Sequence, residues 1–145
     1  MDKEYDELIS NLKEKYKIEE YVLFDDINIQ EKLRENAYMI LHYKGLYFKE
    51  KNNLDKISEI RDKIIGKRFD YYRFNYNKEL KSNEIKEYYL PQDEEITKIN
   101  RLYKKQQWKV DFFEAATEAL IQMGWRMKSY LDERRTWLQY QNIIH

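Results

Sequence analysis

The sequence contains no cysteine, a single proline and only three glycines among its 145 residues. Without cysteine there can be no disulfide, no thiolate nucleophile and no zinc site built from cysteines. Proline and glycine are the residues that most often interrupt helices, so their scarcity favours long helices. No run of residues approaches the roughly 18 apolar residues of a membrane span, and the acidic N-terminus lacks the apolar stretch of a signal peptide. We therefore expect a soluble, intracellular protein with no membrane partner.

The chain also has no net charge, because 27 Lys and Arg residues balance 27 Asp and Glu residues. This balance excludes a nucleic-acid binder that is basic overall, so any such site must be a local patch or be assembled across subunits. Catalytic motifs are missing as well. There is no glycine-rich phosphate loop, and His42 and His145 lie far apart with no Glu-x-x-His pair. We expect no enzyme activity, no metal site and no cofactor.

The sequence does contain clear helical periodicity. Apolar residues at steps of three and four predict a short helix over residues 5–16 and a long helix from Asn28 to about residue 72. The run YVLF, residues 21–24, is too short for more than an extended segment or a small strand. Residues 74–91 are polar, rich in Asn and closed by the only proline, which indicates a loop with or without a short hairpin.

A second long helix is predicted from residue 92 to residue 145, and its apolar pattern is the clearest in the chain. Thirteen positions from Ile96 to Leu138 alternate steps of three and four, and nine of them are apolar. Such a 3.5-residue repeat is typical of helices that pack side by side in a coiled coil. Two of the other positions, Thr117 and Gly124, are small enough to allow a close approach.

The same helix carries a further apolar stripe on its opposite side, so we expect it to be buried on two sides. Association of several copies, for example in a ring, would cover both sides. The alternative is that the N-terminal helices of the same chain cover one of them. The predicted oligomer interface consists of Val110, Phe113, Ala116, Thr117, Leu120, Gly124, Met127 and Leu131.

Cations alternate with aromatic rings in KIIGKRFDYYRF, residues 63–74, where the first long helix is predicted to end. A surface that binds single-stranded DNA without reading its sequence needs cations for the phosphates and rings on which bases stack. The alternative is that the rings form the buried end of a helix and the cations its solvated rim. The residues assigned to DNA binding are Lys63, Lys67, Arg68, Tyr71, Tyr72 and Arg73.

Two segments of the sequence resemble the UvsY family of bacteriophage recombination mediators. RFDYY, residues 68–72, matches the family's Arg-aliphatic-Asp-Tyr-Tyr at the end of its long N-terminal helix. VDFFEAATEALIQMGWRMKSYLDERRTW, residues 110–137, matches the family's C-terminal helix with its Gly-aromatic step. The resemblance extends over residues 5–140. It implies a single all-α domain with a helical, DNA-binding part (residues 1–75), a loop (76–91) and a C-terminal oligomerisation helix (92–145).

The resemblance also implies a function. Members of the family are not enzymes; they bind single-stranded DNA as ring-like homo-oligomers and contact a RecA-like recombinase (UvsX) and the phage single-strand binding protein, which they help the recombinase to displace. Arg68 and Lys67 would contact DNA, and Gly66 stands where the family has a basic residue. The location would be the cytoplasm of an infected bacterium. The residue patterns leave an alternative, a structural helical oligomer such as a virion or scaffold component that does not bind DNA.

Overall fold

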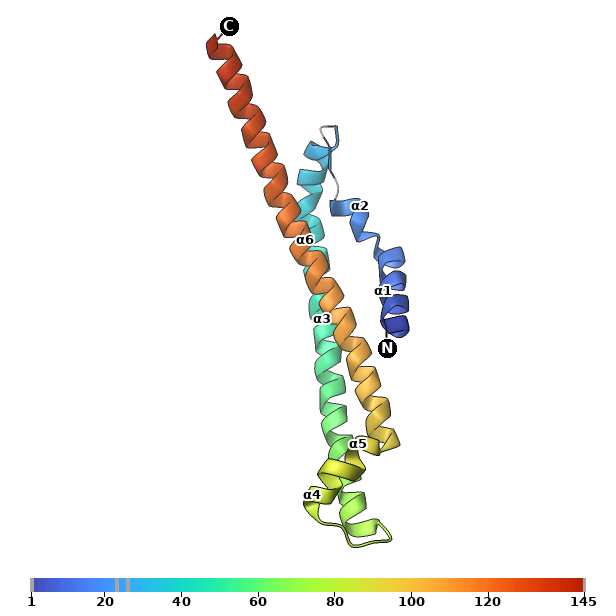
Figure 1. Ribbon diagram of the computed structural model, residues 1–145. Coiled ribbons are helices and arrows are strands. Elements are labelled where there is room, and N and C mark those ends of the chain that lie inside the picture. The colour runs from blue at the N-terminus through green and yellow to red at the C-terminus, as the bar shows by residue number, and fades with distance from the viewer. Residues whose placement is uncertain (1, 23, 26, 145) are drawn as a thin grey trace. The chain divides into compact units, whose positions relative to one another are not determined.

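The computed structural model describes residues 2–22, 24–25 and 27–144, and this part of the chain forms helices and turns but no strand. Helix α1 (Asp2–Tyr16) is followed by α2 (Ile18–Val22) and by two long helices, α3 (Ile29–Asp70) and α6 (Glu94–Ile144) (Figure 1). The connection between the long helices contains η1 (Tyr71–Asn75), α4 (Ser82–Glu84), η2 (Ile85–Tyr89) and α5 (Leu90–Gln92), where η1 and η2 are π-helical turns. The predicted all-α fold with a short N-terminal helix and two long helices is confirmed.

Two predictions about connecting segments are wrong. Tyr21 and Val22, which we expected to be extended, end helix α2, whose first residue Ile18 is buried in the core; Leu23 lies outside the described residues. The segment expected to be a loop or hairpin is helical over residues 82–92. It is not simply a mobile polar loop, because Ile85 within it is fully buried and fixes the short helices in place.

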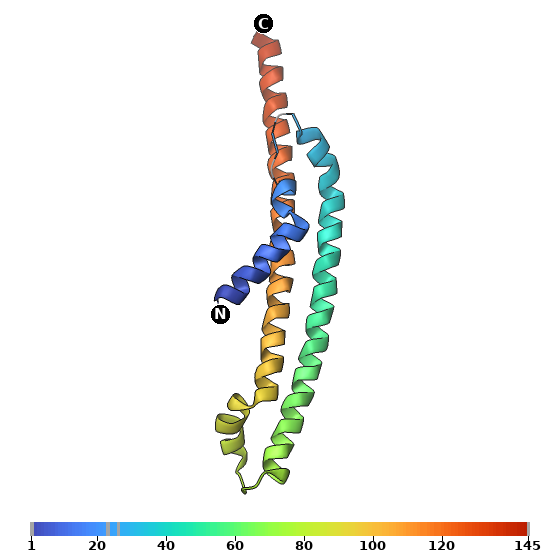
Figure 2. The same cartoon turned by 90° about the vertical axis from the view of Figure 1, so that its right-hand side faces the viewer.

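The chain divides into two compact units. Unit 1 comprises Met1–Tyr47 and Asp111–His145, and unit 2 comprises Phe48–Val110. Helices α3 and α6 contribute to both units, and within each unit they run antiparallel (Figure 2). None of the described helices is both long enough and apolar enough to cross a membrane.

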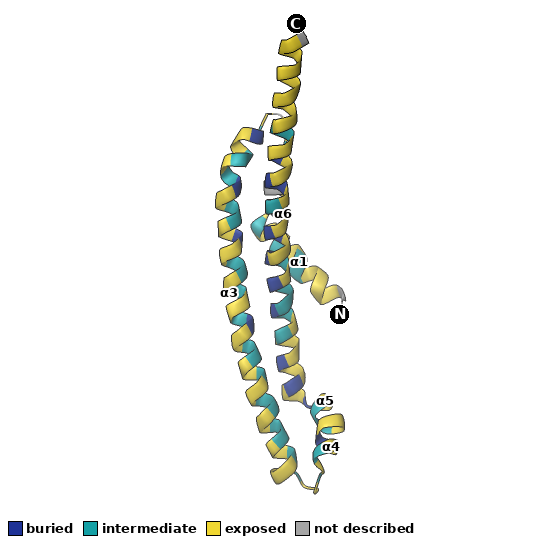
Figure 3. Cartoon of the chain, turned by 90° about the vertical axis from the view of Figure 1, so that its left-hand side faces the viewer, coloured by how far each residue is buried: buried dark blue, intermediate teal, exposed yellow. Residues whose placement is uncertain are grey.

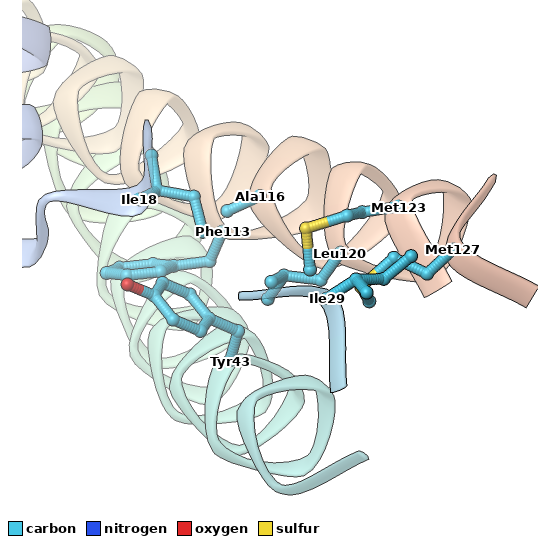
Figure 4. Close-up of a cluster of buried hydrophobic side chains, with 8 residues drawn as sticks. All are labelled: Ile18, Ile29, Tyr43, Phe113, Ala116, Leu120, Met123 and Met127. Carbon is cyan, nitrogen blue, oxygen red and sulfur yellow. The ribbon is translucent and has the colours of Figure 1, made fainter. Parts of the chain in front are cut away.

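The hydrophobic core of unit 1 lies between α6 and the N-terminal helices (Figure 4). Its buried members are Ile18, Ile29, Tyr43, Phe113, Ala116, Leu120, Met123 and Met127. The ring of Tyr16 meets that of Phe113 edge to face, with the centroids 5.0 Å apart. The Tyr43 hydroxyl donates a hydrogen bond to the carbonyl oxygen of Tyr16 at 3.1 Å. The apolar stripe of α6 in unit 1 is therefore covered by helices of its own chain.

A close approach of α3 to α6 occurs in unit 1 at Gly124, as the small residue in the stripe predicted. A Cβ atom at this position would lie 3.2 Å from Cγ of Asn36 on α3. Asn36 is buried, and its Nδ2 donates a hydrogen bond to the carbonyl oxygen of Leu120 at 2.8 Å. The glycine thus leaves room for a buried amide that joins the two helices.

Burial along α6 differs between its two ends (Figure 3). In unit 2 the helix buries Ile96, Ile99, Gln106 and Val110. The buried Gln106 donates from Nε2 to the carbonyl oxygen of Glu50 on α3 at 2.8 Å. By contrast, every described side chain of α6 from residue 132 to residue 143 is exposed.

Candidate nucleic-acid interface

The start of α6 in unit 2 is capped by Asp93, the residue that precedes the helix. Its Oδ1 accepts a hydrogen bond from the backbone N–H of Ile96 at 3.1 Å, and its carbonyl oxygen accepts from the N–H and hydroxyl of Thr97 at 2.9 and 2.8 Å. An aspartate here satisfies a helix N–H that lacks an internal partner and places negative charge at the positive end of the helix dipole. The sequence predicted this helix to begin at residue 92, two residues before its observed start at Glu94.

The second carboxylate oxygen of Asp93 ties the end of α3 to the start of α6. Arg68 Nε donates to Oδ2 at 2.8 Å, and the Tyr72 hydroxyl donates to the same oxygen at 2.7 Å. The side chain of Asp93 is 2% exposed and that of Arg68 24% exposed. Glu95 adds a carboxylate 4.0 Å from Arg68 Nη1. Arg68 and Tyr72, two of the residues assigned to DNA from the sequence, therefore form an internal network with Asp93.

The pKa shifts of the three groups show what stabilises this network. Burial would raise the pKa of Asp93, but hydrogen bonds from Tyr72, Arg68 and the Ile96 N–H together lower that pKa below its usual value. The hydrogen bond to Asp93 raises the pKa of Arg68. Burial, and after it the hydrogen bond to Asp93, raises the pKa of Tyr72. At neutral pH the network is thus an aspartate, an arginine cation and a protonated phenol.

Tyrosine rings from η1, from Tyr76 directly after it, and from η2 lie beside the network. The members of this tyrosine cluster are Tyr71, Tyr72, Tyr76, Tyr88 and Tyr89. Tyr72 lies at its centre, with ring centroids 5.3 Å from Tyr71 and 5.4 Å from Tyr89. The guanidinium carbon of Arg68 lies 4.3 Å from the centroid of Tyr71. These separations are those of aromatic pairs and of a cation over a ring.

Four members of this site come from the segment that the sequence indicated to be a loop or from its edge. Tyr76, Tyr88 and Tyr89 join the tyrosine cluster, and Lys86 places its ammonium 6.0 Å from the ring of Phe69. The signal that could have found them is the second Tyr-Tyr pair, which repeats the pair at residues 71–72. The alternation of cations and rings therefore continues across the connection between the long helices.

The outer surface of the site presents cations and rings together. Lys63, Lys67 and Arg73 are exposed. So are the rings of Phe74 (71%), Tyr88 (60%) and Tyr71 (38%). The Arg73 guanidinium carbon lies 5.6 Å from the centroid of Phe74, and its Nη1 donates to Ser82 Oγ at 3.3 Å. We call these six residues the basic-aromatic patch.

The residues predicted to form an oligomer interface lie mostly inside the chain. Seven of the eight are buried and Leu131 is half-buried. In unit 1 their neighbours include Tyr16, Ile18 and Tyr43 of the same chain. The stripe that was assigned to contacts between copies is thus occupied in the described chain by its own N-terminal helices. Within the described residues no cluster of side chains suited to a metal ion occurs.

Comparisons with known proteins show which solved structures share this fold. No protein-family model matches the sequence, and no curated protein matches it. The structure is similar to two crystal structures of the bacteriophage T4 recombination mediator protein UvsY. The first, in lattice type IV, has a TM-score of 0.75 at 20% identity, covering 88% of this chain and 96% of that chain. The second, in lattice type II, has a TM-score of 0.77 at 18% identity, covering 89% and 96%. The similarity confirms at the level of fold the resemblance seen in the sequence.

Proposed function

We propose that this chain, which has the fold of the T4 recombination mediator UvsY, is itself a recombination mediator and binds single-stranded DNA through the basic-aromatic patch. One observation carries the proposal: exposed cations stand beside exposed rings at the connection between α3 and α6. Cations bind phosphates whatever the sequence, and every base has a face that can stack on a ring. A structural protein has no need for this combination on its surface.

The geometry suggests a division of roles within the site. Lys63, Lys67 and Arg73 contact phosphates, and Tyr71, Phe74 and Tyr88 offer rings for stacking. Each stacked base contributes about 1–3 kcal/mol. Arg68 and Tyr72 are already bonded to Asp93, so they act as positioning residues that hold the patch in shape. This differs from the sequence-based assignment, in which both contact DNA.

A homo-oligomer is part of the proposal, and the exposed end of α6 is the surface best suited to form it. Large side chains that would usually be covered remain exposed along this end: Trp137, Leu138, Tyr140 and Ile143. The rings of Trp137 and Tyr140 stack with centroids 5.9 Å apart. Exposed aromatic and aliphatic side chains gathered at one end of a helix are typical of association sites. Several copies would each present one patch, and multivalency would turn a weak site into a tight one.

The proposed activity is to help a RecA-like recombinase (UvsX) displace the phage single-strand binding protein and form filaments, in the cytoplasm of an infected bacterium. A modest, salt-sensitive affinity for DNA suits a protein that must release the strand to another protein. The second candidate function is a structural helical oligomer, such as a virion or scaffold component. The exposed apolar end of α6 favours a structural oligomer as much as it favours a mediator. The two functions are therefore distinguished by whether the basic-aromatic patch binds DNA.

Anisotropy of a labelled single-stranded oligonucleotide, titrated at several salt concentrations beside a duplex of equal length, tests the proposal. We expect binding that prefers the single strand, because its bases are free to stack, and that weakens steeply with salt. Sedimentation establishes that the protein is assembled. An assembled protein that does not bind at low salt would leave the structural oligomer as the better description.

Gly66→Lys sharpens the test by adding a cation next to Lys67. A Cβ atom added at Gly66 would meet no neighbouring atom within 4 Å, and the same is true of Gly45 in unit 1, which makes Gly45→Lys a matched control. Both changes replace an exposed helical glycine, so both should raise stability by about 0.5–1 kcal/mol. Only Gly66→Lys is expected to raise DNA affinity, by about threefold to tenfold at low salt, with a steeper salt dependence. Equal affinity gains from the two variants would contradict the assigned patch.

A further inference from the structure

A concentration of positive charge lies on α6 within unit 2. Residues 98–109 contain five cations and no acidic residue, although the chain as a whole is neutral. The cations are Lys98, Arg101, Lys104, Lys105 and Lys109. None of them belongs to the basic-aromatic patch. A run of like charges on a folded helix repels itself, so its presence calls for an anionic partner.

These cations lie on one side of the helix. At 3.6 residues per turn they fall, together with Trp108, within an arc of about 140° that is opposite the core positions. The core side of the same stretch is fixed by Ile99, Gln106 and Val110, which are buried. Lys98, Arg101 and Lys104 are exposed, and Lys105 and Lys109 are half-buried. We call the five cations and Trp108 the α6 basic face.

An aromatic ring sits within this face. The Lys104 ammonium lies 5.7 Å from the ring centroid of Trp108, which is half-buried. In the part of the chain that the structure describes, Lys98, Arg101 and Lys105 form no ion pair. The face thus repeats the chemistry of the basic-aromatic patch, with a ring beside several cations, three of which are not paired with a carboxylate in the described chain.

A groove connects the face to the end of α3 within unit 2. Its lining consists of Ile64, Glu95, Lys98, Ile99 and Leu102, and its volume is about 310 Å³. The lining thus includes Ile64, which follows Lys63 of the basic-aromatic patch in the sequence, and Lys98, the first cation of the α6 basic face. Three of the five lining residues, Ile64, Ile99 and Leu102, are apolar.

We propose that the α6 basic face is a second contact surface for single-stranded nucleic acid, which extends the path of the strand from the basic-aromatic patch along α6. Lys98, Arg101 and Lys105 bind successive phosphates, and Trp108 stacks on a base. From Lys98 to Lys109 the helix rises about 16 Å, enough for several contacts along one strand. An acidic protein segment would use the cations but not the ring. The inference rests on the proposed function, since it lengthens the same binding site.

The test is a triple variant, Lys98→Gln, Arg101→Gln and Lys105→Gln, in the anisotropy titration with a labelled oligothymidylate. Each single-strand phosphate contact contributes about 0.7 to the salt slope, so we expect the slope to fall by about 2 and the affinity by about tenfold at moderate salt. The control variant, Lys3→Gln, Lys13→Gln and Lys44→Gln, removes the same charge from exposed positions of unit 1. It should leave the slope unchanged. Circular dichroism and sedimentation confirm that both variants keep their fold and their mass.

The outcomes separate the two proposals. Failure of the unmodified protein to bind overturns the proposed function, and this inference with it. Binding that is equal in the unmodified protein and the triple variant overturns this inference alone. A triple variant that binds the oligonucleotide normally but loses binding to polyglutamate would assign the face to an acidic protein.

Trp108 provides a second measurement that does not depend on removing charge. Trp108→Phe tests the ring directly, because Trp108 is one of three tryptophans and the other two lie outside the α6 basic face. Stacking of a base on Trp108 should quench its fluorescence, so oligothymidylate should quench the unmodified protein more than it quenches Trp108→Phe. Equal quenching of the two proteins at saturation would overturn the proposed role of Trp108.

Discussion

Phe113→Ala is expected to lower the free energy of unfolding of unit 1 by about 3–5 kcal/mol, the range for removing a large aromatic residue from a core. The side chain is 1% exposed, and its ring packs against Tyr16, Tyr43 and Phe112, with centroids 5.0, 6.3 and 5.3 Å away. Denaturant unfolding followed by circular dichroism measures the change, with Leu41→Ala, at an exposed position of α3 in unit 1, as a control that should cost less than about 1 kcal/mol.

Phe113→Ala also tests whether Phe113 packs in the core of its own chain or at an interface between copies. If Phe113 stabilises its own chain, the loss of stability will be independent of protein concentration. If it belongs to a seam between copies, as the sequence indicated, dilution will increase the loss and sedimentation will show a smaller particle that is still folded. A folded chain of reduced mass with an unchanged unfolding midpoint would contradict the position of Phe113 in the core of unit 1.

The periodicity of the sequence predicted both long helices and the buried side of α6. It could not tell whether that side meets the same chain or another copy, because a 3.5-residue repeat packs equally well in either case. In unit 1 the buried side of α6 is covered by its own chain, because α2 and the start of α3 place Ile18 and Ile29 against α6. Residues 17–28, which precede Ile29, have no apolar periodicity of their own. The sequence therefore could not predict where Ile18 and Ile29 pack.

The candidate site was predicted only in part, because some of its contacts join residues that are far apart in the sequence. The alternation of cations and rings located residues 63–74, where the signal is local. The second long helix was predicted to begin near Asp93, yet the partners of Asp93, Arg68 and Tyr72, are 25 and 21 residues away. A polar, Asn-rich composition suggested a loop between them. Only the burial of Ile85 reveals that this connection is ordered and carries Tyr88 and Tyr89 to the site.

Asp93→Ala is expected to destabilise unit 2 by about 2–4 kcal/mol, because it removes a helix cap and leaves Arg68 and Tyr72 without their shared acceptor. Glu95→Gln is the matched control. It removes one negative charge from the first turn of the same helix, but at a side chain that is 63% exposed, and should cost less than about 0.5 kcal/mol. Chemical denaturation at neutral pH measures both variants. Equal losses would show that charge at the helix start matters, and not the network.

The pH dependence gives an independent check on the network. Because folding lowers the pKa of Asp93, its carboxylate contributes stability above its unfolded-state pKa of about 3.9 and loses that contribution as the pH falls through the lower, folded-state pKa. The stability of the unmodified protein should thus decline below about pH 4 by more than that of Asp93→Ala. The difference between the two proteins should shrink as the pH falls. A difference that stays constant from neutral pH to below pH 3 would mean that Asp93 stabilises unit 2 without its charge.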